Sequence, residues 1–189
     1  MQSIANISQR RLAWIALLTA ASVLATGVFA CAVPFAALAA LAALDSESSE
    51  GLLLIGAVWL ANQVVGFGFL GYPLEAQAFA WGVAIGLGAL AAYFAARASV
   101  TALASQGSLA IALGTLPVAF LAYEAVLYAA SLLLPGGEGA FSYRVIAYVG
   151  LVEVVAFIVL LIAHRVAAAA GFLAPNALEG NRLTALTSS

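Results

Sequence analysis

Two glutamates, Glu124 and Glu153, lie within long apolar stretches of a chain in which only 7% of the residues are charged. The stretches cover residues 109–134 and 145–163, and each can cross the ~30 Å hydrocarbon core of a bilayer as a helix. A charged side chain at the bilayer centre costs at least about 2.5–3.5 kcal/mol, so it faces protein or water and usually has a partner. Because such carboxylates are typical of proton relays and ion pathways, both glutamates are candidate proton- or cation-binding residues.

The two glutamates are predicted to lie at a similar depth in the membrane. A turn rich in proline and glycine at 135–139 joins their helices, which should therefore be antiparallel neighbours. Since the two residues lie at similar distances along the chain from this turn, their side chains could face each other. Two adjacent carboxylates would share a proton or a cation, as in a proton-coupled carrier. The alternatives are that each glutamate bonds a neighbouring helix as a structural link, or that one pairs with another subunit.

Two amides, Asn62 and Gln63, lie near the middle of another apolar stretch at 52–70, which is rich in glycine. Glycines and amides together are typical of broken helices in carriers, where oxygens line an ion path. Asn62 and Gln63 are therefore further candidates for the same proton or cation site. The alternative is a packing face whose amides bond a neighbouring helix. His164 lies about three turns after Glu153 on the same face, which suits either a proton path or a headgroup anchor.

Three glycines, Gly82, Gly86 and Gly88, lie in the stretch at 78–96 and are predicted to pack helices together. The first two form a GxxxG motif, and Ala84 with Gly88 continues the pattern of small residues four apart. Small residues at this spacing allow two helices to approach closely. The motif leaves open whether the contact is within the chain or with a partner.

The apolar runs that must position these residues predict an all-α, polytopic membrane bundle of about five transmembrane helices. They continue without alternation, unlike the strands of a membrane barrel. The predicted spans are 12–33, 52–70, 78–96, 109–134 and 145–163. They belong to one membrane domain at 12–173, which follows a cytoplasmic N-terminal segment at 1–11 and precedes a polar C-terminal tail at 174–189.

The first apolar run extends to residue 44 and contains Pro34, which favours a kink or an interfacial turn after residue 33. The alternative is one long tilted helix. Paired arginines before this run and Cys31 within it resemble a lipoprotein-type cleavage signal. The run is longer than the ~7–15-residue apolar core of a signal peptide, so we predict an uncleaved first helix.

The arginines indicate the sidedness of the bundle, because they gather on the cytoplasmic side of membrane proteins. Arg10 and Arg11 place the N-terminus inside and the acidic segment at 45–50 outside. Five spans would then put most later arginines outside, which fits this rule poorly. An alternative with four spans and a re-entrant segment at 52–70 places more arginines inside. It puts inside Arg97, Arg165 and Arg182, and outside only Arg144.

The composition limits the classes of function. With 66% hydrophobic residues and a mean hydropathy of +1.14, the chain lacks the charged surface, roughly a quarter of residues, of a soluble domain. A net charge of −2 without any lysine offers no basic patch for nucleic acid. Cys31 and His164 are the only residues of their types, which excludes an intrachain disulfide, a cysteine-pair metal site and an HExxH zinc site. We expect neither an enzyme nor a cofactor, and the sequence does not identify a metal.

Two classes of function remain. We expect a small permease or transporter component of the bacterial inner membrane, coupled to protons or cations through its intramembrane carboxylates. It would contact the lipid bilayer and form a homo-oligomer or associate with other membrane subunits. The alternative is a structural or accessory subunit of a larger membrane complex, in which the glycine face and the acidic pair are docking surfaces. The sequence does not fix the orientation of the C-terminus.

Overall fold

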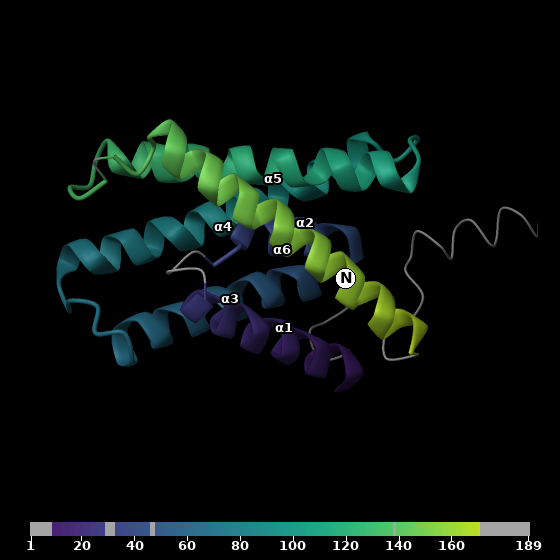
Figure 1. Cartoon of the computed structure of the whole chain (residues 1–189), viewed down its shortest axis with the longest axis horizontal. Helices are drawn as coiled ribbons and strands as arrows, with labels where there is room; N and C mark the ends of the chain where they lie inside the picture. The colour runs from purple at the N-terminus through teal and green to yellow at the C-terminus, as the bar shows by residue number, and fades with distance from the viewer. Residues whose placement is uncertain (1–8, 29–32, 46–47, 138, 171–189) are drawn as a thin grey trace, which may run out of the picture.

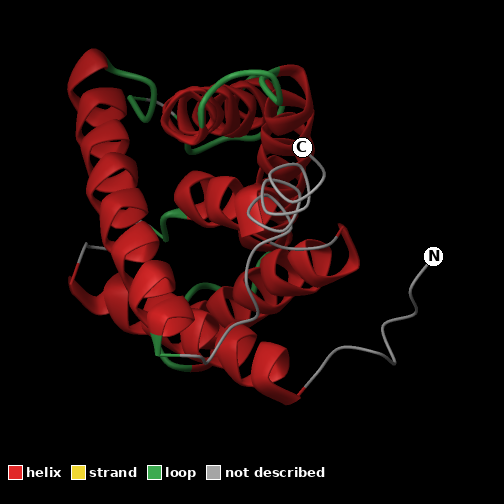
Figure 2. Ribbon diagram, turned by 90° about the vertical axis from the view of Figure 1, so that its right-hand side faces the viewer, coloured by secondary structure: helices red, strands yellow, loops and turns green. Residues whose placement is uncertain are grey.

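The structure, a computed structural model, describes residues 9–28, 33–45, 48–137 and 139–170. All regular elements in these ranges are helices, as Figures 1 and 2 show. They are α1 (Gln9–Val28), α2 (Phe35–Asp45), α3 (Ser48–Gly68), α4 (Ala76–Ala102), α5 (Ser108–Ser131) and α6 (Tyr143–Ala169). Cys31 and the tail at 174–189 lie outside the described residues, as does Arg182.

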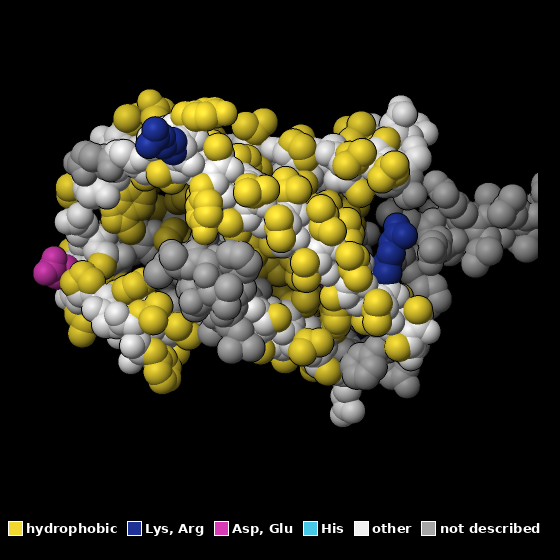
Figure 3. Space-filling view, in the orientation of Figure 1, with side chains coloured by type: hydrophobic (Ala, Val, Ile, Leu, Met, Phe, Trp, Pro, Cys, Tyr) yellow, Lys and Arg dark blue, Asp and Glu magenta, His cyan; other side chains and the backbone are white. Residues whose placement is uncertain are grey.

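Four of the described helices, α3 to α6, are long and apolar enough to cross a membrane. They carry the predicted spans 52–70, 78–96, 109–134 and 145–163, with ends that differ by a few residues. Large apolar side chains are exposed along all four, and they cover much of the surface in Figure 3. Such an exterior suits lipid as the solvent. The predicted helical membrane bundle is therefore confirmed at this level.

The first apolar run forms two helices, α1 and α2, instead of one tilted helix or a helix with an interfacial turn. Pro34 lies directly before α2, where a missing N–H costs nothing because the first helical amides have no partner within the helix. At 11 residues, α2 is about 16 Å long, which is half of a hydrocarbon core. The helix that is too short to cross the membrane is therefore α2, at 35–45. The alternative with a re-entrant segment at 52–70 does not fit, because α3 is one continuous helix over most of that range.

The helix α2 lies at the centre of the bundle, packed against α3, α4, α5 and α6. Each of its residues from Phe35 to Ala43 is buried. Six of these nine residues are alanines, and α4 contributes the fully buried Ala89, Ala92 and Ala96. Such small side chains let helices approach closely in a membrane, where lipid already solvates larger apolar side chains well. The alanine-rich segment is therefore suited to contact protein on all sides.

The C-terminal end of α2 is held by charged side chains from other helices. Asp45 Oδ2 lies 3.2 Å from Arg11 Nη1 of α1, and Asp45 Oδ1 lies 2.8 Å from His164 Nε2 of α6. Arg11 also lies 3.7 Å from Glu50 Oε2 at the start of α3. A carboxylate at a helix C-terminus opposes the helix dipole. Arg11, and His164 when its ring is protonated, compensate for this charge.

These contacts correct the predicted sidedness of the acidic segment. Because Asp45 pairs with Arg11, the chain returns at Asp45 to the end of the bundle from which α1 started. The hydroxyl of Tyr93 donates to the Ser48 carbonyl at 3.2 Å, which brings the C-terminal part of α4 to the same end. The acidic segment therefore lies with the N-terminal arginine rather than across the membrane from it. Four helices that are long and apolar enough to cross a membrane then follow from Ser48 to Ala169.

The resulting arrangement places the arginines asymmetrically. Arg11, Arg97 and Arg165 lie toward the end of the bundle that holds Asp45, while Arg144 starts α6 at the other end. We refer to these as the arginine end and the Arg144 end. The rule that arginines gather inside predicts that the arginine end is cytoplasmic.

Single cysteines in a Cys31→Ser background test this sidedness. Ser48→Cys and Gln106→Cys are exposed at the arginine end, and Ser142→Cys is exposed at the Arg144 end. With a membrane-impermeant maleimide, Ser142→Cys should react in intact cells, and the other two should react only after permeabilisation. The five-span arrangement predicts the reverse pattern, so labelling of Ser48→Cys in intact cells would reject the four-crossing topology.

A second prediction concerns the stability of the arginine end. Asp45→Asn removes the charge and one of the two oxygens that Arg11 and His164 approach. We expect a loss of roughly 1–3 kcal/mol of unfolding free energy, the usual cost of leaving a buried polar group without a partner. Thermal unfolding in mild detergent, followed by circular dichroism, measures this loss. The matched control is Glu75→Gln at the exposed start of α4, which should stay within about 0.5 kcal/mol of the wild type. Equal melting of the two variants would contradict the assigned role of Asp45.

Candidate functional site

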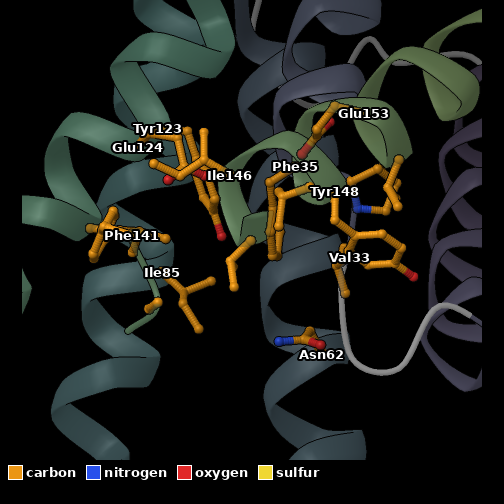
Figure 4. Close-up of a pocket in the computed structure, with 16 residues that line it drawn as sticks. Val33, Phe35, Asn62, Ile85, Tyr123, Glu124, Phe141, Ile146, Tyr148 and Glu153 are labelled. Carbon is orange, nitrogen blue, oxygen red and sulfur yellow. The ribbon is translucent and has the colours of Figure 1, made fainter. Parts of the chain in front are cut away.

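A cavity of about 370 Å³ opens between the N-terminal end of α2 and the facing parts of α5 and α6, with smaller contributions from α3 and α4. Figure 4 shows its lining, and a hollow lined by apolar side chains is visible in Figure 3. Its walls are mainly aliphatic and aromatic. The polar side chains among them are those of Asn62, Tyr123, Glu124, Tyr148 and Glu153.

The cavity exists because α6 packs mainly against α2 and only lightly against α5. In Figure 1 the helix α6 crosses the bundle diagonally, starting near α5 at their connection and moving away from it toward the C-terminal end of α6. Ala140 and Phe141 of this connection line the cavity at the Arg144 end. The buried helix α2 lies between the cavity and the arginine end. The cavity therefore lies toward the Arg144 end of the bundle, and packed protein separates it from the arginine end.

Glu153 is buried, with 2% of its surface exposed, and its carboxylate binds the start of α2. The Ala37 N–H donates to Oε2 at 2.7 Å, and the Ala36 N–H donates to Oε1 at 3.3 Å. At most helix starts a serine, threonine, aspartate or asparagine at the N-cap accepts such bonds. Pro34 cannot, so Glu153 acts as the cap from another helix. Its charge also suits the positive end of the helix dipole.

Glu124 has a different environment from Glu153, although both line the cavity. It is partly buried on α5, and no side chain or backbone group in the described part of the chain bonds its carboxylate. The predicted depth match brings both glutamates to one cavity. They do not form a hydrogen-bonded pair within the described residues, and Glu153 directs its oxygens to α2. In Figure 4 the two side chains lie on different sides of the cavity.

The two amides of α3 separate in the structure. Asn62 lines the cavity, and it too has no hydrogen-bond partner among the described residues. Gln63 lies instead against Gly82 of α4, where a side chain at position 82 would collide with its oxygen. Gln63 thus belongs to the packing of α3 on α4, as the alternative interpretation of this amide had it.

The three glycines of α4 accept large side chains from within the chain. Trp59 of α3 lies over Gly86, and its Nε1 donates to the Gly82 carbonyl at 2.8 Å. The ring of Tyr123 on α5 lies against Gly88, where an added Cβ would approach it to 3.0 Å. These contacts fix α3 and α5 against α4. They thereby position Tyr123 and the neighbouring Glu124 at the cavity.

The aromatic residues of the cavity were not predicted from the sequence. Phe35 stacks on Tyr123 with ring centroids 6.0 Å apart, and Phe141 and Tyr148 contribute from the α5–α6 connection and from α6. The only signal in the sequence was the position of Tyr123 next to Glu124. In a chain with many aromatic residues, this signal is weak.

Glu153 and His164 share one face of α6, as predicted, but a short helix lies against that face. Glu153 holds the first turn of α2, and His164 approaches its last residue, Asp45. The two helices are therefore parallel, and three turns of α6 match the length of α2. Glu153 and His164 therefore both support α2, one at each of its ends.

No group of three or more histidine, cysteine, aspartate or glutamate residues that could hold a metal ion occurs in the described ranges. The comparisons with known proteins identify no relative: no family model, curated protein or solved structure matches the chain.

The contrast between the two glutamates gives a prediction about stability. Glu153→Gln keeps one acceptor oxygen and places an NH₂ group opposite an N–H of α2, so one buried donor loses its partner. We expect a loss of roughly 1–3 kcal/mol of unfolding free energy. Glu124→Gln breaks no bond in the described structure and should change stability by no more than about 0.5 kcal/mol.

Thermal unfolding of both purified variants in one detergent measures the difference. If Glu153→Gln melts with the wild type, or if Glu124→Gln is the less stable variant, the assignment of Glu153 as the helix cap is wrong.

Proposed function

We propose that the chain is a small membrane permease, or the binding component of one, in which Glu124 takes up a proton or a cation from the cavity. The observation that carries this proposal is the carboxylate of Glu124, which has no partner among the described residues, lines a cavity and lies on a helix that is able to span the membrane. Such a group requires a counter-ion or a proton, because an isolated charge is costly in an apolar environment. Exchange of that counter-ion with water at one face is the first step of transport.

In this proposal the two glutamates have separate roles, whereas the sequence favoured one site formed by both. Glu153 supports α2, whereas Glu124 supplies the exchangeable charge, and Asn62 adds a second polar group with free bonding capacity. A short helix beside a cavity is also a common feature of transporters, whose interrupted helices end near the bilayer midplane.

The alternative, an accessory subunit of a larger complex, loses part of its support in the structure. It assigned docking roles to the glycine face and to the acidic pair. Gly82, Gly86 and Gly88 are covered by side chains of α3 and α5, and Glu153 bonds α2. The apolar outer surface fits lipid as well as a protein partner. We retain the bacterial inner membrane as the proposed location, on the basis of composition alone.

Electrical recordings from proteoliposomes on a solid-supported membrane test the proposal. A step in pH or in the concentration of a cation should displace charge in wild-type proteoliposomes. Glu124→Gln should reduce this signal to the level of empty liposomes, because the exchangeable charge is absent. Glu75→Gln, which changes an exposed carboxylate outside the cavity, should retain the signal.

Two results would reject the proposal, the first by removing the role of Glu124 and the second by removing the permease function. One is a signal in Glu124→Gln equal to that of the wild type. The other is the absence of any signal from folded wild type, combined with stoichiometric co-purification of other membrane proteins. The second result would favour the accessory-subunit alternative.

A further inference from the structure

We propose that the ligand of the cavity is a small monovalent organic cation, an amine or quaternary ammonium with an apolar body. This inference rests on the proposed function and specifies the substrate class of the same site. Four properties of the cavity support it: the charge of its lining, the oxygen atoms that could bind an ion, the aromatic side chains and the exposed rim.

The charge of the cavity suits one positive charge. Among the described lining residues, Glu124 is the carboxylate that no described group bonds, since Glu153 accepts from two amides of α2. The described lining contains no arginine, lysine or histidine. A monovalent cation beside Glu124 would neutralise the one carboxylate that lacks a partner. An anion would meet two carboxylates and no cation.

The donor set is poor for an inorganic ion. Ca²⁺ takes about 6–8 oxygen ligands and Mg²⁺ demands an octahedral set, supplied largely by carboxylates, carbonyls and water. Here the carboxylate of Glu124, the amide of Asn62 and the hydroxyls of two tyrosines are set among walls that are mainly hydrocarbon, which is too few oxygen ligands for such an ion. An ammonium group carries its charge on an apolar frame, so it needs fewer oxygen contacts. The frame also fills space that a bare ion would leave to water.

The aromatic walls suit such a ligand. Rings of Phe35, Tyr123, Phe141 and Tyr148 border the cavity, with Phe35 stacked on Tyr123. Aromatic faces attract organic cations, and quaternary ammonium groups are commonly bound in aromatic surroundings. A volume of about 370 Å³ lies at the lower end of the range for small-molecule sites, roughly 300–1,000 Å³.

The access to the cavity is also consistent with an amphiphilic ligand. Val145 and Tyr148 on its α6 side are 40% and 52% exposed. Both residues lie in the first turns of α6, toward the Arg144 end. A cation with an apolar body collects at the membrane interface and can enter there with its charged group leading toward Glu124.

The test measures binding by isothermal titration calorimetry, using the full chain in mild detergent and benzyltrimethylammonium as the probe. Wild type and Glu75→Gln should bind it with equal affinity. Glu124→Gln should bind at least about tenfold more weakly, because the charge partner is lost. Tyr148→Leu, at the exposed rim, should weaken binding about threefold through loss of the cation–aromatic contact. Benzenesulfonate, an anion with a similar ring, should not bind.

The outcomes separate the ligand class from the permease function. If folded wild type fails to bind the probe, or if Glu124→Gln binds it as well as wild type, the organic-cation inference is overturned. Should sodium or proton steps nevertheless displace charge in a Glu124-dependent manner, the proposed function stands without this substrate class. If the probe does not bind and Glu124-dependent currents are also absent, both fail.

Discussion

The first turn of a helix presents backbone N–H groups that no carbonyl of the same helix can accept, and within a membrane water is not available to take them. In this protein the start of α2 lies inside the bundle, and the carboxylate of Glu153 accepts from Ala36 and Ala37. This requirement brings α6 against α2 at that depth and holds it there. Because α6 packs mainly against α2, it packs only lightly against α5, and the cavity lies between the facing parts of these helices. One capping interaction thus accounts for the position of a helix and for the space beside it.

The C-terminal end of α2 has the opposite requirement, because its unpaired backbone groups are carbonyls instead of N–H groups. Its last carbonyls carry partial negative charge, and Asp45 adds a full one, so cations are needed nearby. Arg11 and His164 come from helices far apart in the sequence, yet both are placed by the bundle at this point. The pair of Arg11 and Asp45 shows that the chain is back at the end where α1 begins before α3 starts. The crossings that follow Ser48 then gather the arginines at one end, which is the distribution that membrane insertion favours.

The sequence predicted how deep in the membrane each residue lies, but it did not predict which helices and side chains contact one another. Run lengths and the absence of charge locate four long helices within a few residues, and the turn at 135–139 brings Glu124 and Glu153 to one cavity. The first run was harder, because apolar residues buried in protein and apolar residues facing lipid look alike in a hydropathy pattern. The alanines of 36–43 indicate close protein contact only once a separate short helix is known to begin directly after Pro34. The partners of Glu153 are backbone amides, which no side-chain pattern encodes.

Two residues of the same type, at similar depth in neighbouring helices, therefore have different environments. Glu153 is satisfied by α2, while Glu124 faces the cavity without a partner among the described residues. The same geometry constrains transport under the permease proposal. In that proposal a ligand at Glu124 exchanges with the Arg144 end, because the path to the arginine end is filled by the buried helix α2. Opening that path requires α2 to move, and α2 cannot move without breaking the bonds from Glu153 or carrying α6 with it. Access to the second face is thus tied physically to the state of the buried carboxylate, not to that of Glu124 alone.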